Sequence, residues 1–172
     1  NTATGNITQS GKLSVSGIAT FDADTTNHDD NVILSTAGNS FGTVKAKGTT
    51  VTIVEAGSTA LGSSTVLGAL SVTSSGAITD TDADDDAGLG VLTVTGASTF
   101  TATRNAITLN TSTSDFGGTL TLTGTNVAVT NANTTVTRHN KARVRDIAEL
   151  LAKEDIALWA VFFLVPVGRG QK

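Results

Sequence analysis

The sequence predicts an all-β protein, in which residues 1–133 form a parallel β-helix of about six coils and residues 134–172 a short strand–helix–strand tail. Three observations predict the β-helix. Aliphatic residues alternate with Thr and Ser, turn-forming residues return about every eight to twelve residues, and several strings of residues occur twice. The tail is set apart because every Thr and Ser of the chain lies at or before Thr137.

The alternation has a period of two, which is the period of a strand with one buried face. Thr or Ser usually stands between the aliphatic residues, so hydroxyls would line the other face. Gly, Asn, Asp and Ser separate these segments and favour turns. The aliphatic pairs are Leu13 and Val15, Val51 and Ile53, Leu70 and Val72, Leu92 and Val94, Leu120 and Leu122, and Val127 and Val129.

The repeat has a period of about 71 to 79 residues, which is too long for one coil, so each period should contain several coils. Its matching strings are Gly5–Gln9 with Gly76–Asp80, Leu13–Phe21 with Leu92–Phe100, Val32–Leu34 with Ile107–Leu109, Asn39–Gly42 with Ser114–Gly117, and Gly48–Ile53 with Gly124–Val129. Four Phe residues, at 21, 41, 100 and 116, are expected to fill the interior or the corners.

Two folds accommodate many short strands at this spacing, an antiparallel sandwich and a parallel β-helix. A sandwich needs larger residues at its centre and has no reason to repeat internally. A solenoid can be built from small β-branched residues and generates repeats naturally. We therefore favour the β-helix, with roughly 20 to 25 residues per coil.

Residues 5–133 resemble the repeats of filamentous-haemagglutinin-like bacterial surface proteins. The resemblance is carried by Gly76–Asp80, Leu92–Phe100, Asn105–Leu109, Ser114–Gly118 and Val127–Asn133. It implies a right-handed β-helical rod that is secreted by a two-partner route and holds adhesive regions away from the cell. The expected protein is a stalk segment of a secreted or cell-surface bacterial adhesin. Its partners would be neighbouring repeats and, through regions outside this chain, a host or cell-surface ligand.

The tail predicts a strand at Thr134–Thr137, a helix and a second strand at Leu158–Val165. Val144, Ile147, Ala148 and Leu151 have helical spacing, and the unbroken apolar run of the second strand is typical of burial on both faces. Thr134–Asn140 and Leu158–Gly170 are similar to part of the barrel of radical S-adenosylmethionine enzymes related to haem biosynthesis. That family holds an iron–sulfur cluster on three cysteines, and this chain has none.

An inactive fragment or fusion related to that enzyme family is the alternative interpretation, and no catalytic residue is transferred from it. A stalk repeat joined to one unit of an enzyme barrel has three explanations. They are a gene fusion, a mis-joined or partial sequence, and a segment that caps the last coil. We favour the first two over the cap.

Composition excludes several classes of site. With no Cys, the chain has no disulfide scaffold, thiolate metal site or cysteine nucleophile. Its 11 basic and 15 acidic residues give a net charge of −4, and the basic cluster at 138–145 has no interleaved aromatic residues, so no nucleic-acid partner is expected. The apolar run Ile156–Val167 is shorter than the roughly 18 residues of a membrane span. The chain begins at Asn1 without a signal sequence and is expected to be an internal piece of a longer protein.

One acidic cluster has the spacing of oxygen ligands for calcium. Asp80, Asp82, Asp84 and Asp86 are the candidate ligands of a weak Ca²⁺ site, and the alternative is a solvated insertion loop. An EF-hand is excluded because Asp85 and Val91 stand where its Gly and bidentate Glu belong. A second acidic loop surrounds His28, with Asp22, Asp24, Asp29 and Asp30. No cofactor other than this calcium and no catalytic residue is expected, so we predict that the chain is not an enzyme.

Overall fold

Strands form all of the regular secondary structure that can be described in this chain. The structure is a computed structural model that describes residues 5–23, 30–81 and 90–129, and the strand backbones at 132–136 and 159–163. Within these ranges there are 17 strands and no helix. The sequence therefore predicted the all-β class correctly.

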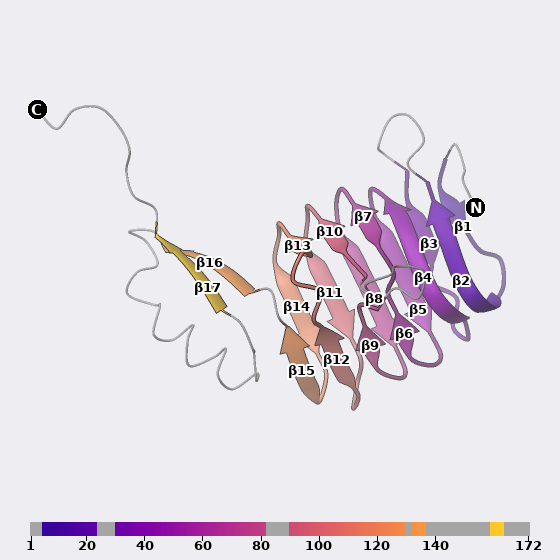
Figure 1. Cartoon of the computed structure of the whole chain (residues 1–172). Helices are drawn as coiled ribbons and strands as arrows, with labels where there is room; N and C mark the ends of the chain where they lie inside the picture. Colours follow the sequence, from indigo (N-terminus) through magenta and orange to yellow (C-terminus); the bar gives the residue numbers. More distant parts are fainter. Residues whose placement is uncertain (1–4, 24–29, 82–89, 130–131, 137–158, 164–172) are drawn as a thin grey trace, which may run out of the picture.

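Fifteen strands wind into a three-faced parallel solenoid, whose turns stack along one axis (Figure 1). The first face contains β1 (Ile7–Thr8), β3 (Val32–Leu34), β5 (Val51–Glu55), β8 (Leu70–Ser74), β11 (Ser98–Thr101) and β14 (Leu120–Thr123). The second contains β6 (Thr59–Ala60), β9 (Ile78–Thr79), β12 (Ala106–Leu109) and β15 (Asn126–Val129). The third contains β2 (Ser14–Asp22), β4 (Ser40–Gly48), β7 (Ser64–Val66), β10 (Leu92–Val94) and β13 (Asp115–Phe116).

The solenoid completes five turns and begins a sixth. On the first face Ile7 pairs with Val32, and the column continues through Val51, Leu70, Ser98 and Leu120, so the turns advance by 25, 19, 19, 28 and 22 residues. The two longest turns contain residues 24–29 and 82–89. The predicted coil length of roughly 20 to 25 residues is close to these values, and the predicted six coils become about five turns.

The first two turns differ from the later ones because β2 and β4 are long strands that cover two faces without a break. Val44 in β4 bridges to Leu61, just after β6 on the second face, whereas Lys47 pairs with Thr65 in β7 on the third. The register between β2 and β4 shifts between Val15 and Ile18. At this β-bulge a Cβ on Gly42 would overlap the carbonyl oxygen of Ser16.

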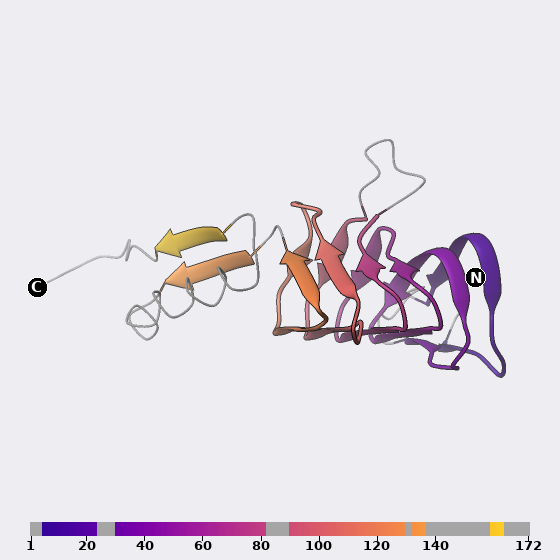
Figure 2. The same cartoon turned by 90° about the horizontal axis from the view of Figure 1, so that it is seen from below.

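The interior is a stack of aliphatic side chains. Along the strands of the first face, buried residues alternate with more exposed ones, and Val32, Val51 and Val72 are fully buried. Burying each such side chain stabilises the fold by about 1.5–3 kcal/mol. Three of the four Phe residues noted above are buried as expected, and Phe116 is partly buried. Figure 2 shows the rungs of the solenoid stacked one behind another.

Glycines stack at the corner between the third and first faces. The amide of Gly96 donates to the carbonyl oxygen of Gly68 at 3.0 Å. A Cβ on Gly96 would lie 2.5 Å from that oxygen, and one on Gly118 would lie within 3 Å of the Gly96 carbonyl. This close approach of successive turns leaves no room for a side chain at the corner.

The tail contributes two strands, β16 (Ala132–Val136) and β17 (Trp159–Phe163), which pair in parallel in a separate sheet. They overlap the two strands predicted at Thr134–Thr137 and Leu158–Val165 but have different ends. The helix predicted from Val144 to Leu151 lies outside the described residues, so the structure does not support a complete strand–helix–strand unit. The predicted boundary between residues 133 and 134 falls inside β16, and the division into two domains stays a prediction.

The corner glycines give a test of this packing. Gly96→Ala should lower the free energy of unfolding by about 1–3 kcal/mol, because its methyl group overlaps the turn before it. Gly57→Ala is the matched control, since nothing lies within 4 Å of a Cβ placed there. Urea denaturation followed by circular dichroism measures both variants. Equal midpoints for the two would show that the corner has more space than described.

Candidate functional site

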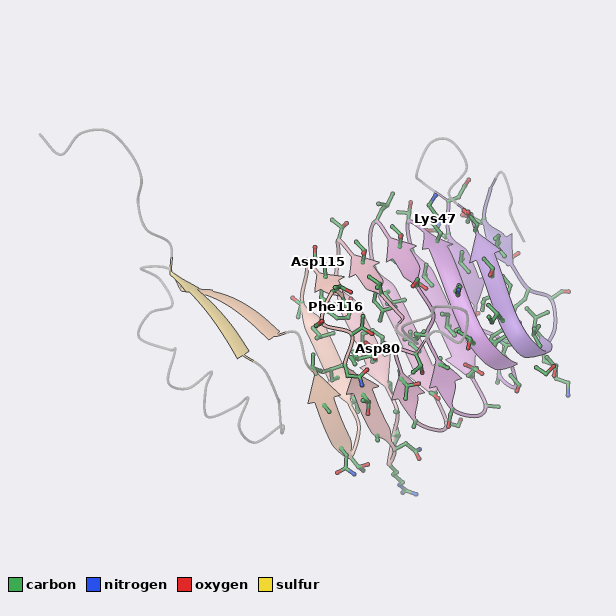
Figure 3. All side chains as sticks on the ribbon, in the orientation of Figure 1. Lys47, Asp80, Asp115 and Phe116 are labelled. Carbon is green, nitrogen blue, oxygen red and sulfur yellow. The ribbon has the colours of Figure 1, made fainter. Side chains whose placement is uncertain are left out.

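Of the four predicted calcium ligands, only Asp80 can be placed, and it lies at the corner between the second and third faces. Asp80 follows β9 directly and is only 1% exposed, whereas Asp82, Asp84 and Asp86 lie outside the described residues. Figure 3 labels Asp80 in the body of the solenoid. The calcium site as a set therefore stays a prediction, and only its first member can be placed.

The Asp80 carboxylate faces the backbone of the following turn. Its Oδ1 accepts the amide of Asn110 and its Oδ2 the amide of Thr111, both at 2.9 Å. The Thr111 hydroxyl donates back to the Asp80 carbonyl oxygen at 3.2 Å. Burial raises the pKa of Asp80, and these amides partly offset the rise. In the described structure Asp80 therefore caps two amides where the chain turns the corner.

A second polar cluster occupies the corner between the first and second faces. Asn39 has no exposed surface, and its Oδ1 accepts the Leu13 amide at 2.9 Å and the Gln9 side-chain amide at 2.8 Å. Its Nδ2 donates to Gln9 Oε1 and to the carbonyl oxygens of Leu34 and Val54. One side chain therefore joins three successive turns.

Glu55 continues this corner into the next turn. It is 2% exposed, and its Oε1 accepts the Phe41 amide at 2.8 Å. Its Oε2 and the Thr59 hydroxyl make no hydrogen bond of normal geometry. Burial raises the pKa of Glu55, with a partial offset from the Phe41 amide and the nearby Thr59 hydroxyl. This carboxyl is a buried group that is only half satisfied.

Sequence reasoning missed these corner groups as a class. Ser64 and Ser114 belong to it as well, since each hydroxyl accepts a backbone amide, from Ala46 and from Leu92. A signal was present, because Asn39 and Ser114 directly precede strands and Glu55 ends one, and each is polar where the aliphatic pattern stops. Without the corners, such residues cannot be distinguished from ordinary turn residues.

The other candidate residues are only partly placed. Asp22 pairs in register with Lys47 on the third face, and Asp30 lies just before β3. Asp24, His28, Asp29, His139 and the basic cluster at 138–145 lie outside the described residues. Among the side chains that are described, no three His, Cys, Asp or Glu residues come together as metal ligands.

The outer surface is regular and carries few charges. On the third face Asp22, Lys47, Thr65, Thr93 and Asp115 form one column across five strands, and Figure 3 labels Lys47 and Asp115 on it. A hollow of about 440 Å³ opens at the N-terminal end and is lined by residues that include Ile7, Leu13, Phe21 and Leu34. Ile7, Phe21 and Leu34 are themselves buried, so the hollow borders the core of the first turn. In the part of the chain that can be described, no helix is long and apolar enough to cross a membrane.

Comparison with known families matches residues 1–46 and 48–123 to a family described as repeats of unknown function (DUF5649). The chain belongs to the DUF5649 repeat family. The second matched range begins at Gly48 and ends just before Gly124, the residue that matches Gly48 in the internal repeat. No curated protein and no solved structure matches the chain. The DUF5649 match names neither filamentous haemagglutinin nor a radical S-adenosylmethionine enzyme.

The Asn39 cluster predicts a large effect from one substitution. Asn39→Ala should lower the free energy of unfolding by about 2–3 kcal/mol, because the part-buried Leu13 amide and the buried Leu34 carbonyl oxygen both lose the partner that Asn39 provides. The exposed Asn126 on β15 provides the control, and Asn126→Ala should change the value by less than about 0.5 kcal/mol. Urea titration followed by circular dichroism compares them. A small effect at Asn39 would mean that water replaces its hydrogen bonds.

Glu55 predicts a pH dependence with a definite sign. Its raised pKa means that the folded chain keeps this proton at pH values where the unfolded chain, with a pKa near 4.5, has lost it. Its stabilising contribution is therefore complete below pH 4.5 and is lost as pH rises through the folded-state pKa.

Glu55→Gln should make the urea midpoint less dependent on pH between about 4.5 and 8. Asp115→Asn removes the same charge from an exposed position on β13 and is the matched control for the loss of a carboxylate. Equal slopes for the Glu55 variant and the parent chain would contradict the assignment.

Proposed function

We propose that this chain is a structural stalk segment of a secreted or cell-surface bacterial adhesin, and that it acts through stiffness and length without catalysis. The supporting observation is the parallel stacking of strands on all three faces, with six strands on the first face, four on the second and five on the third. Each turn adds about 4.8 Å along the axis, so the length of such a rod grows with the number of repeats.

The stacking provides stiffness for a physical reason. Hydrogen bonds between turns run along the axis, as from the Val51 amide to Ala69 and from the Leu70 amide to Ala97, both at 2.9 Å. Bending the rod stretches these bonds on one face and compresses the packed interior on another. Because the three faces share one core, no face can move alone.

The described side chains support a passive role. The buried carboxyls Glu55 and Asp80 both accept backbone amides inside the rod, where no substrate reaches them. Outward positions on the first face are occupied mainly by Thr and Ser, such as Thr52, Ser71, Thr99 and Thr121. The partners in this proposal are neighbouring repeats, and a host or cell-surface ligand is bound by regions outside this chain.

Surface location is the part of this proposal that one experiment tests directly. Antibodies raised against the full chain should label intact cells of the organism that produces it, and brief protease treatment of those cells should remove the signal. A cytosolic protein probed in parallel should be labelled only after permeabilisation. Detection of the repeat protein only in permeabilised cells would overturn the proposal.

A further inference from the structure

The two copies of the internal repeat lie on different faces of the solenoid. Gly5–Gln9 contains β1 on the first face, whereas its match Gly76–Asp80 contains β9 on the second. In the same way, β3 on the first face matches β12 on the second, and β5 matches β15. Each string of the second copy is therefore one face further round the axis than its match.

Matching side chains of the two copies make the same hydrogen bonds, although the strings lie on different faces. Asn39 Oδ1 accepts the Leu13 amide at 2.9 Å, and Ser114 Oγ accepts the Leu92 amide, at the matching positions, at 3.0 Å. The Thr36 amide donates to Gln9 Oε1, as the Thr111 amide does to Asp80 Oδ2. The second copy therefore makes the same hydrogen bonds as the first, but it makes them at the corner between the second and third faces, whereas the first copy makes them at the corner between the first and second faces.

The aromatic contacts follow the same rule. Phe21 and Phe41 meet edge to face with ring centroids 5.8 Å apart, and their matches Phe100 and Phe116 do so at 6.1 Å. The interior packing of the repeat is thus reproduced in the second copy, although its strands belong to different sheets.

The period of the repeat explains the rotation. From β5 to its match β15 the chain takes ten steps, one face at a time, which is three turns and a third. Gly48 and Gly124 are 76 residues apart, whereas three turns from Val32 to Ser98 take only 66 residues. A repeat of three whole turns would have returned each string to its own face.

The C-terminal end of the solenoid has the surface that the next copy would cover. Leu120, Leu122 and Val127 are only partly buried there. Their matches Val44, Ala46 and Val51 are at most 3% exposed, because β6, β7 and β8 lie against them. Gly124–Val129 matches Gly48–Ile53, the string with which the second range matched to the family begins.

We propose that this end is a docking surface for a further copy of the same repeat, and that each copy is rotated by a third of a turn relative to the one before it. Three copies then make ten turns and return to the starting face. A surface feature that occurs once in each repeat would therefore lie on a different face in each of three successive copies. The inference concerns how copies join, and it holds for a rod in any compartment.

Two insertions into the full chain distinguish rotated from unrotated joining. The first adds a second copy of residues 54–129 directly after Val129, which continues the repeat in phase and places the new β6 on the third face. The control adds a second copy of residues 62–129 at the same point, which returns every strand to its own face. Both insertions contain the same acidic segment and all strands from β7 to β15.

The in-phase insertion should raise the urea midpoint and slow hydrogen exchange of the β14 and β15 amides about tenfold or more, because a new turn covers them. The control insertion should leave this exchange as fast as in the parent chain. Equal or greater protection in the control would overturn the rotation. Failure of both insertions to protect β14 and β15 would overturn the docking surface itself.

Discussion

Hydrogen-bonded stacking of each turn on the previous one is the constraint on which the rest of this molecule depends. Because the pairing is parallel and in register, a residue meets its counterpart in the next turn directly above it, as Val51 meets Leu70. Most columns therefore keep one character along the axis, and the buried Ser98 is an exception within an aliphatic column of the first face. Aliphatic residues fill the inner columns, glycine occupies the tightest corner, and hydroxyls face outward. The low aromatic content follows from this, since few columns have space for a ring.

The corners are where this stacking is most costly to maintain. The chain changes direction there, and amides such as those of Asn110 and Thr111 point into the interior without a strand carbonyl to accept them. A buried polar side chain provides the acceptor at each such point, from Asn39 and Glu55 at one corner to Asp80 and Ser114 elsewhere. The raised pKa values of the two carboxyls result from placing charge where water cannot follow.

Much of this fold could be predicted from the sequence, because alternation reports burial directly and an internal repeat favours a solenoid. The strands at Leu70–Ser74 and Leu92–Val94 fall where alternation put them. The functions of Asp80 and Asn39 could not be predicted, since periodicity says which side chains are buried without saying which amides they meet. The sequence also could not show that β2 and β4 continue across two faces without a break, because a bend in a strand does not change the alternation of aliphatic and polar residues.

The contacts beside residues 82–89 have a consequence for how such rods diversify. The Gly90 amide donates to the Asp80 carbonyl oxygen at 2.8 Å. The Ser64 amide donates to the carbonyl oxygen of Val91, in the next turn, at 2.9 Å. The two residues at which the described chain stops and resumes, near Asp80 and Gly90, are thus joined directly by a backbone hydrogen bond. Since closing a longer loop adds little free energy per residue, this corner accepts insertions of many lengths. It is a natural graft point, where evolution or an engineer can add new sequence without redesigning the scaffold.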